Sequence, residues 1–193
     1  MNKVLKAITI VACAAMLVAG SVAATLAYIA TKTNPITNTF VAGDVTITLT
    51  ETTGSDYTMV PGTTIEKDPI ITVSQGSEKC WLFVKVTETE HFDTYLSYSM
   101  DASWTTYAGE EGVYYCLVDA KNAEQIVHVL ENDEITANAN CTKEQYNDII
   151  ASGNKPTLTF TAYAVQYVGF EETVDNYIES AWTVAKAAQV ATP

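Results

Sequence analysis

The segment Cys80-Trp81-Leu82-Phe83-Val84-Lys85-Val86-Thr87 is the most apolar stretch of the chain after its N-terminal leader. Both of its alternating sets of side chains are apolar: Cys80, Leu82, Val84 and Val86 on one side, and Trp81 and Phe83 on the other. A strand with one face in water alternates apolar and polar residues, whereas a strand covered on both faces does not. The segment therefore predicts a central strand that is buried on both faces.

The sequence on either side of this segment has the period-two pattern of half-buried strands. Val45, Ile47 and Leu49 alternate with threonines. The segment Thr157–Val168 is expected to be the longest strand, with one apolar face formed by Leu158, Phe160, Ala162 and Ala164. Further strands are predicted at Ile70–Val73, Tyr95–Met100, Val113–Val118 and Gln125–Leu130.

The loop Gly109–Gly112, with sequence Gly-Glu-Glu-Gly, lies between two of these segments. It predicts a hairpin of Tyr95–Met100 and Val113–Val118 with an acidic tip. Many short strands separated by turn residues, without a βαβ rhythm, favour a mainly β fold. We expect a β-sandwich of the jelly-roll type with two short helices.

Two segments have helical spacing. Thr142 is placed to cap a helix over Lys143–Ala151, where Gln145 completes a capping box and the inward side chains would be Tyr146, Ile149 and Ile150. A C-terminal helix is expected to begin at Thr173 or Asp175. Its apolar stripe would consist of Val174, Ile178, Ala181, Trp182 and Ala185, with Trp182 as the core anchor.

The charge of the chain is strongly negative. It has 10 basic and 23 acidic residues, and none of the basic residues is arginine. Nucleic acids and anionic lipid surfaces are bound through lysine and arginine, which neutralise their phosphates. This composition therefore excludes nucleic acid as a partner.

The N-terminal 27 residues have the organisation of a signal peptide. Lys3 and Lys6 form a basic region, Ala7–Ala19 is apolar, and small residues in Thr25-Leu26-Ala27 precede cleavage at Tyr28. We therefore expect residues 1–27 to be removed on export by a signal peptidase, leaving eight basic and 23 acidic residues, a formal charge of −15. An uncleaved leader acting as a membrane anchor is the alternative, and membrane contact is expected only through such a leader.

No constellation for catalysis is apparent. His91 and His128 share no zinc-binding spacing, and neither lies near a nucleophilic serine turn. Glu131–Glu134 is acidic but lacks the ordered ligand pattern of a calcium loop. The sequence predicts no enzyme activity, no metal site and no cofactor.

Three cysteines remain after the leader: Cys80, Cys116 and Cys141. We expect them to be reduced apolar core residues, with a cross-strand Cys80–Cys116 disulfide as the alternative. The acidic pairs Glu110-Glu111 and Glu171-Glu172 are expected to be solvated. Trp104 and Tyr107 are either core residues or exposed aromatics suited to binding carbohydrate.

Several segments of the chain resemble a known family. The leader end Ala24–Tyr28, the stretch Asn38–Val45 and the segments 59–69, 76–86, 157–166 and 181–182 are similar to the TasA/camelysin family of SipW-dependent biofilm matrix proteins, in its gut-Firmicute branch. The resemblance implies a jelly-roll subunit secreted by a Gram-positive bacterium to its matrix or surface. It further implies assembly with copies of itself, or with other matrix proteins, into fibres.

In that family the mature N-terminal segment adds to the next subunit as a strand. The corresponding arm here is residues 28–40, followed by the folded domain at 41–193, and its candidate residues are Ile29, Pro35, Ile36 and Phe40. Pro35 and the polar residues around it oppose a helix and permit an extended arm. The alternative for the arm is the first strand of its own domain. The alternative for the whole protein is a monomeric adhesin or carbohydrate-binding module.

Overall fold

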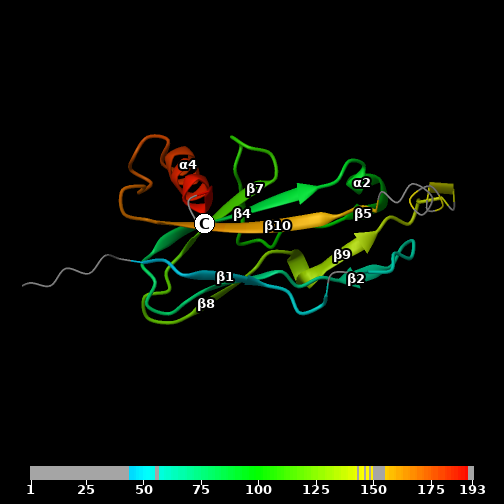
Figure 1. The fold of residues 1–193 in the computed structure, drawn as a ribbon, viewed down its shortest axis with the longest axis horizontal. Coiled ribbons are helices and arrows are strands. Elements are labelled where there is room, and N and C mark those ends of the chain that lie inside the picture. Colours follow the sequence, from blue (N-terminus) through cyan, green and yellow to red (C-terminus); the bar gives the residue numbers. More distant parts are fainter. Residues whose placement is uncertain are drawn as a thin grey trace, which may run out of the picture. The chain divides into compact units, whose positions relative to one another are not determined.

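A computed structural model describes residues 44–54, 57–142, 144, 145, 147, 149 and 155–190. The leader, its expected cleavage site Thr25–Tyr28 and the arm with Ile29, Pro35, Ile36 and Phe40 lie outside the described residues. The described part is mainly β and contains three antiparallel sheets (Figure 1). Within it, no helix has the length and apolarity needed to cross a bilayer.

The first sheet has four strands in the order β10-β4-β7-β6. Their bounds are Leu158–Gln166, Cys80–Glu88, Val113–Val118 and Thr105–Thr106. The prediction of a central strand is confirmed, because β4 pairs with β10 on one side and with β7 on the other.

Two three-stranded sheets lie against one face of this sheet. One has the order β1-β3-β8, with bounds Ile47–Thr50, Ile70–Val73 and Gln125–His128. The other has the order β2-β9-β5, with bounds Thr64–Glu66, Glu134–Ala137 and Leu96–Ser97. The helical elements whose bounds lie within the described residues are α2 (Phe92–Tyr95), the 3-10 turn η1 (Glu131–Asp133) and α4 (Tyr177–Val190).

The two smaller sheets follow one another along the same two chain segments. Strands β2 and β3 form one segment, β8 and β9 form the other, and the pairing is interrupted once between them. Between the β2–β9 and β3–β8 pairings, residues 67–69 stand opposite the longer segment 129–133. Asn132 and Asp133 have φ values of 56° and 55°, in the left-handed region that these side chains tolerate better than most. The extra residues and this backbone conformation explain why the pairing does not continue as one sheet.

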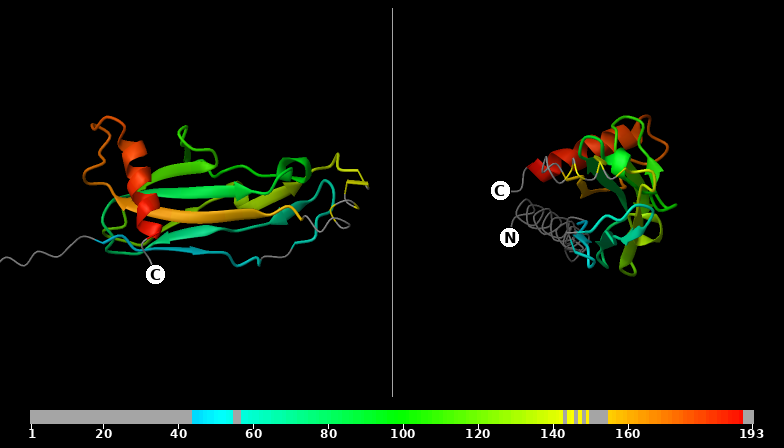
Figure 2. Two further views of the ribbon diagram at one scale, coloured as in Figure 1. Left: turned by 45° about the horizontal axis from the view of Figure 1, so that its top comes forward. Right: turned by 90° about the vertical axis from the view of Figure 1, so that its right-hand side faces the viewer.

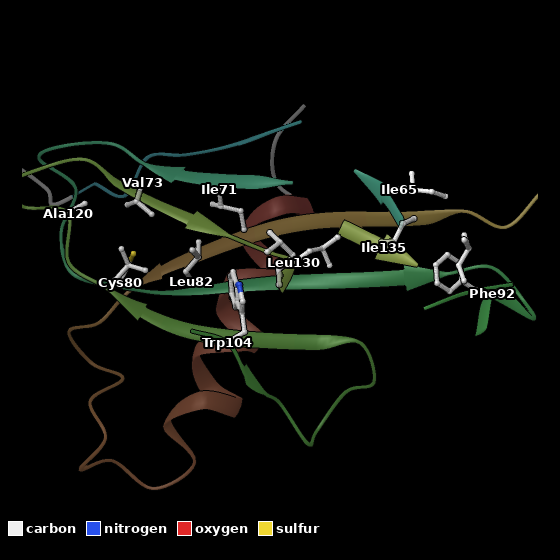
Figure 3. Packing of buried hydrophobic residues seen from close by; sticks show 14 of the residues in the cluster. Ile65, Ile71, Val73, Cys80, Leu82, Phe92, Trp104, Ala120, Leu130 and Ile135 are labelled. Atoms are coloured by element: carbon white, nitrogen blue, oxygen red, sulfur yellow. The ribbon is translucent and has the colours of Figure 1, made fainter. Parts of the chain in front are cut away.

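The main core lies between the four-stranded sheet and the two smaller sheets (Figure 3). The even-numbered side of β4 supplies Cys80, Leu82 and Val84 to it, opposite Ile71 and Val73 of β3. A second cluster lies on the other face of β4, where Trp81 and Phe83 pack beneath α4. Apolar side chains thus cover both faces of β4, as predicted from a segment in which apolar and polar residues do not alternate.

The helix α4 covers the outer face of the four-stranded sheet (Figure 2). Its buried side chains are Ile178, Ala181, Trp182 and Ala185. These four residues confirm the predicted stripe, but Val174 was wrongly included. The helix begins at Tyr177, and Val174 lies 44% exposed in the preceding turns.

The predicted start of α4 at Thr173 or Asp175 is also wrong. Asn176 has a φ of 55°, which no helical residue adopts, and the amide of Ser180 donates to the Asn176 carbonyl as the first bond of the helix. Because Asn176 interrupts the helical backbone, Thr173 and Asp175 lie before the helix and cannot cap its first turn.

The expected hairpin of Tyr95–Met100 and Val113–Val118 is wrong. Val113–Val118 forms β7 as expected, but its hairpin partner is the short β6. Residues 96–97 form β5 in a different sheet, where they pair with β9. The segment 98–104 therefore crosses from one layer to the other, and alternation along the sequence does not predict this crossing.

The capping box at Thr142 is confirmed. The amide of Gln145 donates to Thr142 Oγ1 at 3.3 Å, and the amide of Thr142 donates to Gln145 Oε1 at 2.8 Å. Residues 144, 145, 147 and 149 are helical, and Ile149 is buried as expected. Tyr146 and Ile150 lie outside the described residues.

Candidate functional site

A cavity of about 430 Å³ lies at the end of the main core formed by β2, β5, β9 and α2. Its apolar wall includes the buried side chains of Ile65, Phe92, Leu96 and Ile135. Figure 3 shows Ile65, Ile135 and Phe92 together at this end of the core. The size is within the range of small-molecule sites, which is roughly 300–1,000 Å³.

Lys67 lies in the wall of this cavity and is only 6% exposed. Its Nζ donates to Glu51 Oε1 at 2.6 Å. The same ammonium lies over the rings of Tyr57 and Phe160, at 5.2 and 5.5 Å from their centroids. A buried charge requires such compensation, so the carboxylate and the two aromatic faces explain how Lys67 remains inside the fold.

The loop that carries Glu51 is fixed by its neighbours. Asp68 accepts hydrogen bonds from the amides of Thr52 and Thr53, at 2.9 and 3.0 Å, and from both threonine hydroxyls. These bonds, with that from the Thr52 hydroxyl the strongest, hold the pKa of Asp68 far below its usual range. Burial, and then the hydrogen bond to Glu51, raise the pKa of Tyr57. The result is a hydrogen-bonded polar network beside the apolar cavity.

Sequence reasoning missed Lys67, although a signal was present. In the segment Thr64–Pro69, Ile65, Lys67 and Pro69 have the same parity and are all buried. The period-two pattern that places Ile65 inside therefore places Lys67 inside as well. A lysine in phase with core residues is the feature that could have identified this site.

Glu110 forms a second polar centre, on the outer face of the four-stranded sheet. Its Oε1 accepts from Lys85 Nζ at 2.5 Å, and its Oε2 accepts from Trp182 Nε1 at 2.8 Å and from Lys186 Nζ at 2.9 Å. These hydrogen bonds, first that from Lys85, lower the pKa of Glu110 to about 2. The expectation of a solvated carboxylate is wrong for Glu110, because the loop folds back to meet α4.

The loop can approach the sheet this closely because residue 112 is glycine. Gly112 has a φ of 72°, and a Cβ at this position would lie 2.3 Å from the carbonyl oxygen of Val86. Only a residue without a side chain fits there. The remaining acidic residues of the two predicted pairs lie in loops as expected, and Glu171 accepts the amide of Gly169 at 2.9 Å.

The pH dependence of stability should carry the signature of Glu110. Its folded-state pKa lies below the usual value of 4.5, so its contribution is complete above about pH 4.5 and is lost as the pH falls toward about 2. We expect Glu110→Gln to lower Tm at pH 7 and to unfold at nearly the same temperature as the unaltered protein near pH 2. Thermal melts at several pH values measure this. An equal Tm difference at all pH values would contradict it.

The two histidines do not form a site with each other. His91 is 71% exposed at its side chain, and His128 pairs through Nδ1 with Asp133 at 2.9 Å. Among the described residues, no group of three or more His, Cys, Asp or Glu side chains is arranged to hold a metal ion.

Trp104 does not offer a surface for carbohydrate. It is 8% exposed, belongs to the main core and donates from Nε1 to the carbonyl of His128 at 2.8 Å. Tyr107 is half-buried and packs against the cluster beneath α4. The core alternative for both aromatics is therefore the correct one.

Cys80, Cys116 and Cys141 are free thiols, as expected. Burial raises the pKa of all three thiols, that of Cys80 to about 11 and that of Cys116 to about 12. Thiolates are the reactive form of cysteine. The two strand cysteines are therefore the protected ones.

Thiol labelling should separate these three cysteines. At pH 8 we expect Ellman's reagent to modify Cys141 first in the folded protein, and Cys80 and Cys116 only on the timescale of unfolding. The Cys141→Ser variant should lose the fast phase, and addition of urea should release the slow one. A fast phase that remains in Cys141→Ser would contradict the assignment.

Comparison with protein-family models, with curated proteins and with solved structures finds no match to this chain.

Proposed function

We propose that this chain is a secreted structural subunit of a Gram-positive extracellular matrix and assembles into fibres by strand addition. The proposal unites three features: the export leader, the resemblance to the TasA/camelysin family, and an open side of the fold. It also treats the facing sheets as a jelly-roll-like sandwich. No catalytic activity and no cofactor form part of it.

The open side is the observation that carries the proposal. β10 is an edge strand nine residues long, and β4 is its only strand partner among the described residues. β1 is the edge strand of the facing sheet and lies beside β10 (Figure 1). The unpaired backbone groups of an edge strand bind an extended segment readily.

The proposed occupant is the arm of residues 28–40 from another copy. It is long enough to pair along the whole of β10. In an extended arm Ile36 and Phe40 would present apolar side chains on one face, and Ile29 would present one on the other. Cleavage before Tyr28 would free this arm at the same step that releases the protein. The arm could instead pair with its own domain, and the experiment below distinguishes these outcomes.

Electron microscopy of the mature protein, residues 28–193, tests the proposal. The formal charge of −15 opposes association, so we expect fibres to form as the pH is lowered or divalent cations are added. Ile36→Asp and Phe40→Asp should abolish fibres. Thr37→Asp, which adds the same charge on the opposite side of an extended arm, is the matched control and should assemble. A wild-type protein that stays monomeric under all these conditions would refute the proposal.

A monomeric surface binding module is the second candidate. The sequence argument for it required an exposed Trp104, and Trp104 is buried. The cavity beside Lys67 independently favours a binding role. A protein that remains monomeric in the microscopy and binds a small molecule saturably would favour this candidate.

A further inference from the structure

The cavity has a charge character opposite to that of the chain. Acidic residues outnumber basic ones by 23 to 10 in the sequence. Among the described residues that line the cavity, the charged ones are nevertheless both lysines, Lys67 and Lys155. The positive charge of these two lysines favours anionic molecules over cationic ones.

The two lysines differ in what balances their charge. Lys67 is buried and is compensated by Glu51. Lys155 is exposed, and among the described residues no acidic side chain lies within ion-pair distance of it. Within the described part of the cavity lining, Lys155 is therefore the lysine without an acidic partner, and it is exposed to solvent.

The rest of the lining is mostly apolar. Ile65, Phe92, Leu96 and Ile135 are buried core residues, and Met59 and Leu158 are half-buried. The free energy falls when an alkyl chain covers such a surface and removes it from water. Of the polar lining residues, Thr157 lies in the same segment as Lys155, whereas Tyr57, Thr58 and Lys67 lie in other segments.

We propose that this cavity binds a single-chain amphiphile with a carboxylate head, such as a fatty acid. The alkyl chain lies against the apolar wall, and the carboxylate lies at Lys155. Charge complementarity selects an anionic head in a chain that otherwise repels anions. The site reaches the open side at Leu158, the first residue of β10, but the inference does not depend on fibre assembly.

Isothermal titration calorimetry of the mature protein with sodium laurate tests the site. We expect one molecule to bind per chain, and dodecyltrimethylammonium, which has the same alkyl length and the opposite charge, not to bind there. Lys155→Glu should weaken laurate binding about tenfold, which corresponds to roughly 1.4 kcal/mol. Lys121→Glu is the matched control, because Lys121 is exposed and lies outside the lining.

A second variant tests the cavity itself. Met59→Trp should fill part of the volume and weaken laurate binding, while circular dichroism reports whether the variant folds. The proposal is overturned if laurate shows no saturable binding to the wild type, or if Lys155→Glu binds it as tightly as Lys121→Glu does. It is also overturned if a peptide of residues 28–40 binds and laurate does not, an outcome that would assign the cavity to the arm.

Discussion

Trp182→Ala is expected to lower the free energy of unfolding by about 3–5 kcal/mol, the usual range for removing a buried tryptophan. The indole is 3% exposed and lies between the sheet and α4. Its ring centroid is 5.3 Å from that of Phe83 and 4.9 Å from that of Tyr163, the latter in an edge-on arrangement. The variant loses these contacts, creates a cavity and removes a hydrogen bond to Glu110.

Urea denaturation followed by circular dichroism measures this effect. Val184→Ala is the matched control, because Val184 lies on the same helix with 47% exposure and should change stability by about 0.5 kcal/mol or less. A loss below about 1 kcal/mol for Trp182→Ala would show that the cluster beneath α4 contributes little to the stability of the domain.

Glu51→Ala is expected to destabilise the protein more than Lys67→Met. Removing the carboxylate leaves the Lys67 ammonium buried without its partner, which costs about 3–5 kcal/mol for fully buried pairs. Since the Glu51 side chain is 27% exposed, we expect about 3 kcal/mol. Lys67→Met leaves Glu51 near solvent, where it still accepts from Tyr57, so its cost should be about 1 kcal/mol.

The order of the two variants is the decisive result. The double variant Glu51→Ala/Lys67→Met should be close to Lys67→Met alone, because the uncompensated charge is then absent. Glu78→Ala serves as the control, since it breaks the exposed Glu78–Lys121 pair, whose atoms are 3.8 Å apart, and should cost about 0–1 kcal/mol. A larger loss for Lys67→Met than for Glu51→Ala would mean that its contacts with Tyr57 and Phe160 matter more than its charge.

The sequence predicted local elements where apolar periodicity was strong. The strands Ile70–Val73 and Val113–Val118 have the expected bounds, and the capping box at Thr142 is present. The short strands β2, β5, β6 and β9 were missed or misassigned. Strands of two to four residues show too few alternations to be distinguished from loops, and tertiary pairing alone determines where they form.

The candidate site was predictable only in part. The parity of Lys67 with Ile65 indicated a buried lysine, but its partner Glu51 lies 16 residues away, and nothing in the local pattern connects the two. The same holds for Glu110, whose contacts with Lys85 and Trp182 span 25 and 72 residues. Side chains this distant meet only when the layers have packed.

The sequence by itself determined that the strand at Cys80–Thr87 would be covered on both faces, because apolar side chains on both sides of a strand must leave water. The tertiary structure alone decided what covers each face: two small sheets on one side, and α4 on the other. It also decided that acidic and basic groups far apart in the chain meet as Glu51–Lys67 and Glu110–Lys85. Alternation along a strand reports only whether a side chain is buried, whereas the identity of its partner depends on pairings between distant segments.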